Sequence, residues 1–172
     1  MAEELIEVVA PDGRVLDTVS RSAVHGNPDL LHKVVHILVF NTAGALLLQR
    51  RSMKKDVAPG RWDTSVGGHV SPGEDNMTAA LREMEEELGI AAGGDLAFLY
   101  SYIHSNPYES ELVHTYCTIH DGPFSFNAEE IDEVRFWLLS DLAELGDSAL
   151  LSDNFRHELR SYLHHIESPL RK

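Results

Sequence analysis

Three glutamates in the middle of the sequence have the type and spacing of a metal-binding set. Glu83, Glu86 and Glu87 stand at positions i, i+3 and i+4, so on an α-helix they would share one face. Each like-charge pair on a helix costs about 0.2–0.5 kcal/mol, and a hard cation would remove this repulsion. Ligands that are all oxygen favour Mg²⁺ or Mn²⁺, which fill their shells with water and phosphate oxygens. The spacing therefore predicts a divalent-metal site; the alternative is an ordinary solvated acidic face.

The residues around these glutamates predict a short, bounded helix. Apolar residues recur on the opposite face, at Met77, Leu81, Met84 and Leu88. Residues 71–74, Ser-Pro-Gly-Glu, are typical of a turn before the helix, and Gly89 stands where a helix end favours a left-handed residue. We therefore expect a helix that packs with one face and presents its carboxylates on the other.

The complete pattern around this helix resembles the Nudix box, a long gapped motif. Every fixed position of the box is matched, at Gly68, Glu74, Arg82, Glu83, Glu86, Glu87 and Gly89, with Met84 and Ile90 at its apolar positions. Nudix enzymes mostly hydrolyse a diphosphate linkage in a nucleoside diphosphate joined to another group. The resemblance therefore implies a pyrophosphohydrolase with an α/β fold, in which a mixed sheet lies between helices in an α/β/α sandwich.

The resemblance also implies roles for the matched residues. Glu83, Glu86 and Glu87 would bind Mg²⁺ or Mn²⁺, and one carboxylate near or within this set would activate the attacking water. Arg82 would orient a carboxylate, and Gly68 would shape the loop before the helix. The structural positions of the motif would be Gly68, Glu74 and Gly89. Phosphoryl chemistry depends chiefly on positioning and on neutralising oxygen charge, which a metal-carboxylate helix supplies.

A second set of residues resembles the isopentenyl-diphosphate isomerase branch of the same superfamily, over about residues 25–140. The ligand positions of that branch match His25, His32, His69, Glu109 and Glu111. The resemblance thus implies a second divalent-metal site, for which mixed imidazole and carboxylate ligands would suit Zn²⁺ or Mn²⁺. The remaining histidines are expected at the surface or in hydrogen-bonded core positions: His36, His104, His114, His120, His157, His164 and His165.

Two departures from the isomerases favour hydrolysis. The isomerases have a catalytic cysteine where this chain has Gly67, and Cys117 lies far along the chain in an expected strand. They also carry a degenerate box, whereas all three glutamates are present here. The alternatives are an isomerase-like reaction with Glu111 alone as proton donor, and a Nudix domain that binds a ligand without catalysis.

A dense basic cluster precedes the motif in this otherwise acidic chain. Its members are Arg50, Arg51, Lys54 and Lys55. The isomerase resemblance assigns Arg51 and Lys55 to a substrate diphosphate, which arginine and lysine recognise by charge and hydrogen bonding. Arg50 and Lys54 are expected to face solvent, because alternate residues of an extended segment point to opposite sides. The alternative is a basic loop that only adds solubility.

Composition limits the function further. The length of 172 residues, with 43% hydrophobic and 24% charged residues, fits one domain covering residues 1–172, with a hairpin at residues 1–24 as its extension. A formal net charge of −14 disfavours nucleic acid and anionic membranes as partners and leaves a small-molecule diphosphate as the expected one. The single cysteine and the absence of a signal-like start predict a cytoplasmic protein. The sequence leaves the oligomeric state open.

Apolar runs and turn residues predict the other elements. Strands are expected at residues 5–9, 14–18, 33–40, 45–49, 63–66, 96–104, 111–120 and 134–139, with residues 20–31 as a loop. Ser140 is expected to cap a short helix at residues 141–145. A final helix is expected at residues 153–166, because Phe155, Leu159, Leu163 and Ile166 step by three and four.

Overall fold

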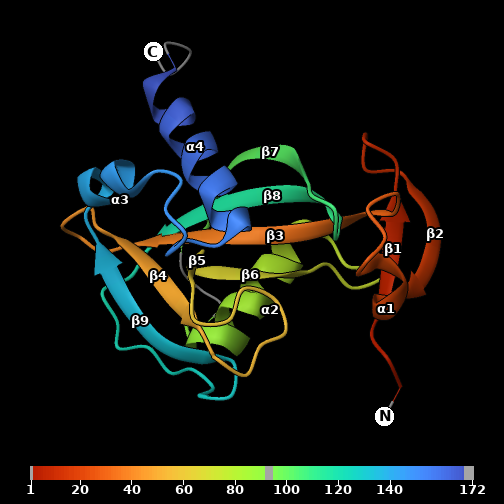
Figure 1. Ribbon diagram of the computed structural model, residues 1–172, viewed down its shortest axis with the longest axis horizontal. Coiled ribbons are helices and arrows are strands. Elements are labelled where there is room, and N and C mark those ends of the chain that lie inside the picture. The colour runs from red at the N-terminus through yellow and green to blue at the C-terminus, as the bar shows by residue number, and fades with distance from the viewer. Residues whose placement is uncertain (1, 92–94, 169–172) are drawn as a thin grey trace.

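A mixed β-sheet of nine strands organises the part of the chain that this computed structural model describes, residues 2–91 and 95–168. The strands are β1 Leu5–Val9, β2 Val15–Ser20, β3 Leu31–Phe40, β4 Leu46–Arg51, β5 Trp62–Asp63, β6 Val66–His69, β7 Ala97–Ser105, β8 Ser110–Ile119 and β9 Ile131–Trp137. The helices are α1 Arg21–Val24, α2 Asn76–Leu88, α3 Leu139–Leu145 and α4 Asp153–Glu167. α2 and α4 cover opposite faces of the sheet (Figure 1), which confirms the predicted mixed α/β fold.

Strand β3 is the centre of the sheet, because four other strands pair with it. It runs parallel to β8 over its whole length and antiparallel to β6, β1 and β4. The register places His32 beside Glu111 and His36 between Gly67 and Thr115. Paired residues on neighbouring strands point to the same face of a sheet. The pairing therefore gathers polar side chains from three strands on one face.

Two apolar cores fill the two faces of this sheet. On one face, Ala80, Met84 and Leu88 of α2 pack against β3 residues such as Val35 and Ile37. The other core joins the sheet to α3 and α4 through Leu38, Leu46, Leu48, Trp62, Leu142, Leu151, Phe155 and Leu159. This packing fixes α2 and α4 on the sheet, and both helices contribute residues to the site described below. No helix of the described ranges has the length and apolar character needed to cross a membrane.

The N-terminal hairpin forms as predicted, but the expected loop at residues 20–31 contains a helix. β1 pairs with β2 across a turn in which Gly13 has a φ of 86°, and β1 meets β3 through Val8 and His32. The short helix α1 follows β2 directly, and its Val24 is buried in a small core with Ile6 and Val8. Burial of this one apolar side chain accounts for a helical turn in a polar segment.

The strand predicted at residues 63–66 is wrong, because the chain changes partner there. β5 pairs with β4, and β6 pairs with β3. Ser65 lies between them, where its hydroxyl accepts from the Val39 amide at 3.0 Å and donates to the Leu47 carbonyl. One side chain thus bridges β3 and β4 at the point where they separate.

The start of α3 and two apolar positions also differ from expectation. Helix α3 begins at Leu139 with Leu138 as N-cap, and no side chain caps it, so the predicted Ser140 cap is wrong. β9 accordingly ends at Trp137 rather than at residue 139. Met77 and Ile166 are 37% and 40% exposed, because both lie near the ends of helices that extend past the core. The extent of α4 matches the prediction closely.

Candidate active site

A cavity of about 980 Å³ opens between α2, β6, the segment after β4 and the start of α4. Most of the predicted site residues line it: His25, Arg51, Lys55, Gly68, His69, Arg82, Glu83, Glu86, Glu87, Glu109 and Glu111. His32 lies fully buried beside it. Glu74 and Gly89 do not line the cavity. They lie at the two ends of helix α2, in the turn before it and at its C-terminal cap.

Helix α2 begins and ends at well-defined caps. Asp75 is the N-cap, and its carboxylate accepts from the Thr78 amide at 2.9 Å. Gly89 has a φ of 66° and donates its amide to the Glu85 carbonyl at 2.9 Å, which confirms the predicted left-handed end. The turn before the helix is held by the Ser71 amide, which donates to the Glu74 carboxylate at 3.0 Å. The glutamates of α2 are therefore presented from a fixed helix.

Arg82 connects the turn, the helix and strand β6. Its guanidinium donates two hydrogen bonds to the Glu74 carboxylate, at 3.0 and 2.9 Å, and one to the Glu83 carboxylate at 2.6 Å. It also donates to the His69 carbonyl at 3.1 Å. The paired contact with Glu74 uses the fork geometry of arginine. Arg82 thus orients Glu83 toward the cavity, and Glu74 holds Arg82 in place.

Gly68 admits the Glu83 carboxylate to the sheet. It lies within strand β6, paired with Val35, rather than in the loop expected from the sequence. A Cβ atom at position 68 would lie inside the Glu83 carboxylate. Only glycine therefore allows α2 to approach β6 closely while Glu83 stays between them.

Glu87 is the most deeply buried carboxylate of α2. Burial raises its pKa to about 8, although Gln49 donates a hydrogen bond to it at 2.6 Å. Glu83 is less enclosed, and burial raises its pKa against the opposing effect of Arg82. Glu86 is 59% exposed at the mouth of the cavity. Buried carboxylates of this kind are stabilised in their charged form by a cation.

The three α2 carboxylates face one cavity but do not converge on one point. Within the described ranges, two other groups of potential ligands lie with their donor atoms within 4.8 Å of one another. Glu83 and Glu86 turn toward Arg82, and Glu87 turns toward Gln49. Their types and common cavity fit a divalent cation, because carboxylate oxygens are the protein ligands that Mg²⁺ prefers.

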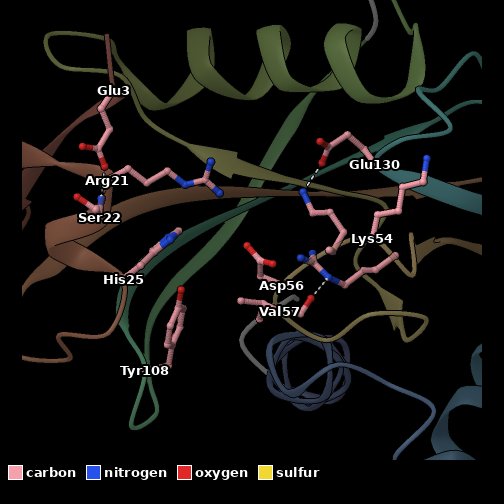
Figure 2. Close-up of a pocket in the computed structure, with 11 residues that line it drawn as sticks. Glu3, Arg21, Ser22, His25, Lys54, Asp56, Val57, Tyr108 and Glu130 are labelled. Atoms are coloured by element: carbon pink, nitrogen blue, oxygen red, sulfur yellow. Dashed lines mark hydrogen bonds and ion pairs between the residues drawn. The ribbon is translucent and has the colours of Figure 1, made fainter. Parts of the chain in front are cut away.

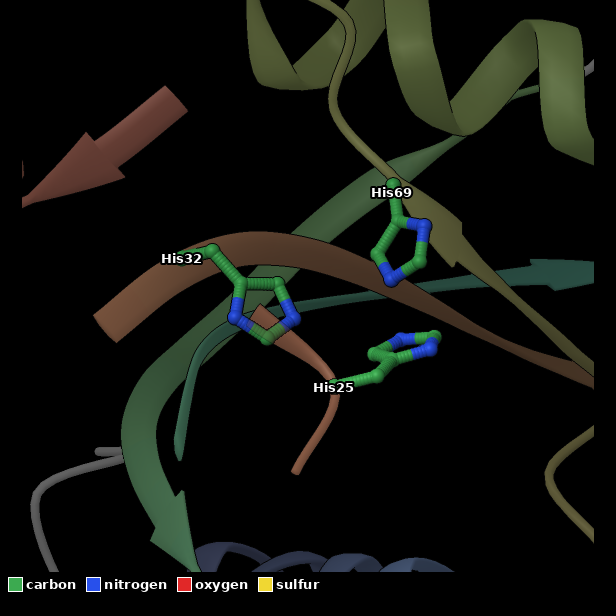
Figure 3. A group of neighbouring side chains, drawn as sticks. All are labelled: His25, His32 and His69. Carbon is green, nitrogen blue, oxygen red and sulfur yellow. The ribbon is translucent and has the colours of Figure 1, made fainter. Parts of the chain in front are cut away.

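The histidine and glutamate set is closely assembled. His25, His32 and His69 form one group with donor atoms within 4.8 Å, and His32, Glu109 and Glu111 form the other. Figure 3 shows the three imidazoles approaching one another from separate segments, with ring centres 5.3–6.4 Å apart. The register of β3 with β8 explains half of this arrangement, since it pairs His32 with Glu111. All five residues predicted from the resemblance thus meet around His32.

The chemistry of this set fits a divalent metal. The Nε2 atom of His32 is buried and has no hydrogen-bond partner in the described chain. Burial, with the neighbouring His69, lowers the pKa of His25 and of His32 to about 4. Both imidazoles are therefore neutral and can each offer a nitrogen lone pair to a metal ion. Burial and the nearby Glu109 raise the pKa of Glu111 to about 8. Neutral imidazoles and crowded carboxylates are the ligands that Zn²⁺ or Mn²⁺ would bind.

Three members of the basic cluster, Arg51, Lys54 and Lys55, line a second, smaller cavity of about 620 Å³ that adjoins the first. Figure 2 shows Arg21, His25 and Tyr108 on one side of it and Lys54 and Glu130 on the other. Arg21 and Tyr108 line both cavities. Neither was predicted as a site residue, because the short helix and the loop that carry them gave no motif.

Every member of the basic cluster contacts an acidic residue. Arg51 donates to Asp63 at 3.2 Å and to the Val57 carbonyl at 2.8 Å, while Lys55 pairs with Glu130. Arg50 and Lys54 pair with Glu133 and Glu129 at 3.6 and 2.7 Å. Arg50 lies outside both cavities, whereas the exposed Lys54 lines the smaller one. Lys54 faces solvent as predicted, with a side chain that is 65% exposed, although it lies in the turn that follows β4 rather than in the strand.

Sequence reasoning also missed polar residues that position the carboxylates. Asn154 donates to Glu111 at 2.8 Å, and the Ser152 hydroxyl donates to Asp63 at 2.9 Å. Both come from the start of α4, which lines the cavity. His36 was assigned to the hydrogen-bonded core; it is hydrogen-bonded, but it also lines the cavity. No local pattern marks these residues, since the partner of each lies far away in the sequence.

Comparison with known proteins agrees with this architecture. The chain matches the NUDIX domain over residues 30–159. It is 37% identical over 133 residues to an uncharacterized Nudix hydrolase from Pseudomonas aeruginosa, covering 77% of this chain and 78% of that protein. It is also 33% identical over 145 residues to an isopentenyl-diphosphate Delta-isomerase from Streptomyces avermitilis, covering 81% and 74%.

A solved structure supports the fold. A crystal structure of a Deinococcus radiodurans protein superposes with a TM-score of 0.79 at 24% identity, covering 92% of this chain and 98% of that one. At this identity the likeness concerns the fold alone. The matched domain and the relatives above 30% identity, together with a complete box on α2, show that the chain belongs to the Nudix family of hydrolases.

Proposed function

We propose that the protein hydrolyses a diphosphate linkage in a nucleoside-diphosphate-linked or related small molecule, with Mg²⁺ or Mn²⁺ held by α2. The observation that carries the proposal is the placement of Glu83, Glu86 and Glu87 along one cavity that also receives Arg51 and Lys55. Phosphoryl transfer requires carboxylates that bind a cation and positively charged side chains that bind phosphate.

The chemistry follows from these side chains. Water attacks a phosphorus atom, the bond to the bridging oxygen breaks, and the leaving phosphate takes the electron pair. One of the cavity carboxylates accepts the proton of the water. A bound divalent ion would supply charge neutralisation to the phosphoryl oxygens. Arg82 orients Glu83 throughout, because its hydrogen bonds to Glu74 and the His69 carbonyl fix its position.

Arg51 and Lys55 are proposed to hold the phosphates that are not attacked. Both currently pair with carboxylates, Asp63 and Glu130, so a diphosphate would compete for their hydrogen bonds. The His25, His32, His69, Glu109 and Glu111 set is proposed to hold a second divalent ion, Zn²⁺ or Mn²⁺. Its support is the orphaned His32 Nε2 atom and the close approach of the five side chains.

An isomerase-like reaction is the second candidate, because isopentenyl-diphosphate isomerases are among the relatives. Moving a double bond requires proton donation and removal by two groups placed on opposite faces of the substrate. Gly67 lines the cavity but offers no side chain, and Cys117 is not among the cavity residues. Hydrolysis is therefore the function that this site supports best.

The test is incubation with Mg²⁺ and a panel of nucleotide sugars, dinucleoside polyphosphates, coenzyme A and prenyl diphosphates. Hydrolysis in ¹⁸O-labelled water should place one label in a phosphate product. Glu86→Gln and Glu87→Gln should each lower the rate about a hundredfold or more, while Glu85→Gln, on the exposed side of the same helix, should not. Unchanged rates in both variants, or isomerised prenyl diphosphate as the product, would contradict the proposal.

A further inference from the structure

His36 occupies the floor of the larger cavity, on the central strand β3. Its side chain is only 8% exposed, yet it lines the cavity. Its Nδ1 atom lies 2.7 Å from the Glu158 carboxylate. The Nε2 atom has no hydrogen-bond partner among the described residues, and it is not among the fully enclosed polar atoms. The free edge of the imidazole therefore faces the cavity.

Glu158 fixes the orientation of this imidazole. It is fully buried on α4, and besides His36 it accepts hydrogen bonds from the hydroxyls of Tyr100, Tyr102 and Thr115, at 2.6, 2.7 and 2.9 Å. Four donors around one carboxylate stabilise its ionised form. An ionised Glu158 can only accept, so His36 carries its proton on Nδ1.

The surroundings favour a second proton on His36. Burial works to lower its pKa, but the hydrogen bond and charge of Glu158 outweigh burial, and the result is a raised pKa. The carboxylates of Glu111 and Asp63 act in the same direction. A protonated imidazole donates from both nitrogens. The cavity floor then presents an Nε2–H donor, and the Glu158 carboxylate beneath it balances the positive charge of His36.

Gly67 leaves this donor accessible. It pairs with His36 in the β3–β6 ladder, and a Cβ atom there would lie 3.3 Å from His36 Cδ2 and 3.7 Å from Nε2. The Gly67 amide also acts on the Glu87 carboxylate, where it opposes the effect of burial on the pKa. Gly67 thus lies between a proposed metal ligand and the exposed edge of His36.

Three cationic groups of the cavity, Arg82, Arg51 and Lys55, already contact acidic residues. Arg82 donates to Glu74 and Glu83, and Arg51 and Lys55 pair with acidic residues. The cavity also contains many carboxylates, so an anionic substrate would gain from a donor that does not first have to leave an acidic partner in the cavity. The His36 Nε2–H group is such a donor, and its position is set by a buried network.

We propose that His36 is a substrate-contacting residue whose Nε2–H group donates a hydrogen bond to a phosphoryl oxygen of the bound diphosphate, with Glu158 as its positioning residue. This inference rests on the proposed function for the identity of the ligand. The contact would form across Gly67 from Glu87 and would complement the contacts of Arg51 and Lys55.

The test measures binding of imidodiphosphate, a non-hydrolysable diphosphate, to the full chain with Mg²⁺ by calorimetry. Loss of a charge-assisted hydrogen bond corresponds to about ten- to hundredfold weaker binding, which we expect for His36→Leu. His36→Gln, which keeps an amide donor near the Nε2 position, should recover most of the affinity. The control is His164→Gln, on the exposed side of α4, which should bind as the wild type does.

A second measurement leaves the His36–Glu158 pair intact, in case His36→Leu does not fold. The ¹⁵N NMR spectrum of the wild type should show both His36 nitrogens protonated, with the Nε2–H signal shifting when imidodiphosphate is added. Gly67→Ala should weaken binding at least severalfold, because its methyl group narrows the approach to Nε2. These effects require no turnover, so they are separate from the hydrolysis assay.

The outcomes distinguish the two proposals. Wild-type binding with an unshifted His36 signal, or equal affinity in His36→Leu and the wild type, overturns the contact even if hydrolysis is observed. Absence of any imidodiphosphate binding overturns it as well. A shifted signal and weakened variants without hydrolysis of any tested compound would support the contact and refute the proposed reaction.

Discussion

Replacing Gly68 by alanine tests the close packing of α2 against β6. The added methyl group would occupy the position of the Glu83 carboxylate. Glu83 would have to rotate away, which breaks its 2.6 Å hydrogen bond from Arg82. The backbone of the strand is unaffected, because Gly68 does not require a positive φ. The perturbation therefore acts through one side chain.

The expected loss of stability is moderate. Overpacking typically costs about 1–3 kcal/mol, and the low end applies because the displaced atoms end a flexible side chain. The Arg82–Glu83 pair adds little, since Arg82 is 31% exposed and screened by solvent. We expect a loss of about 1–2 kcal/mol in the free energy of unfolding, or about 2–8 °C in Tm for a domain of this size.

Guanidinium unfolding of four proteins measures the effect: wild type, Gly68→Ala, Glu83→Ala and the double variant. In the Glu83→Ala background the added methyl group should cost less than about 0.5 kcal/mol, because the atoms that it displaces are gone. Gly67→Ala is the matched control, since its methyl group meets His36 instead and should be insensitive to Glu83. An equal cost of Gly68→Ala in both backgrounds would refute the packing argument.

Three other predictions concern the charges of the site. Lys55→Glu should raise KM at least tenfold with little change in kcat, and it should make KM more dependent on salt. Steady-state kinetics measures both effects, and an unchanged KM would mean that the basic cluster only adds solubility. Metal analysis after exposure to Zn²⁺ or Mn²⁺ should find one ion fewer in a His25→Ala, His69→Ala double variant than in the wild type, and equal content would exclude the second site. Glu158→Gln should lower Tm most between about pH 4.5 and 6.5. The lowered pKa of Glu158 stabilises the fold at pH values above the pKa of this group in the unfolded chain. The raised pKa of His36 stabilises the fold at pH values below the pKa of its imidazole in the unfolded chain. Thermal melts should show a smaller difference at pH 9, and a pH-independent difference would contradict the ion pair.

The sequence determined the features of the site that depend on local geometry. The spacing of Glu83, Glu86 and Glu87 places them on one face of a helix whatever surrounds it, and Gly89 ends that helix because the chain must turn left-handed there. The strands were also recognisable from a local signal, because runs of apolar residues are typical of strands buried in a sheet. The local signal failed at residues 63–66, where a change of partner strand divides one short segment between two strands.

Tertiary structure decided which distant residues meet. The parallel register of β3 and β8 places Glu111 beside His32 and Thr115 beside His36, and one residue of slippage would turn these side chains to the other face. The role of Gly68 emerges only when α2 lies on β6, and the importance of Glu158 only when α4 lies on the sheet. In the sequence, Glu158 is an ordinary polar position of an amphipathic helix. Its dependence on four hydrogen-bond donors follows from its burial, and burial arises from packing, which has no local sequence pattern.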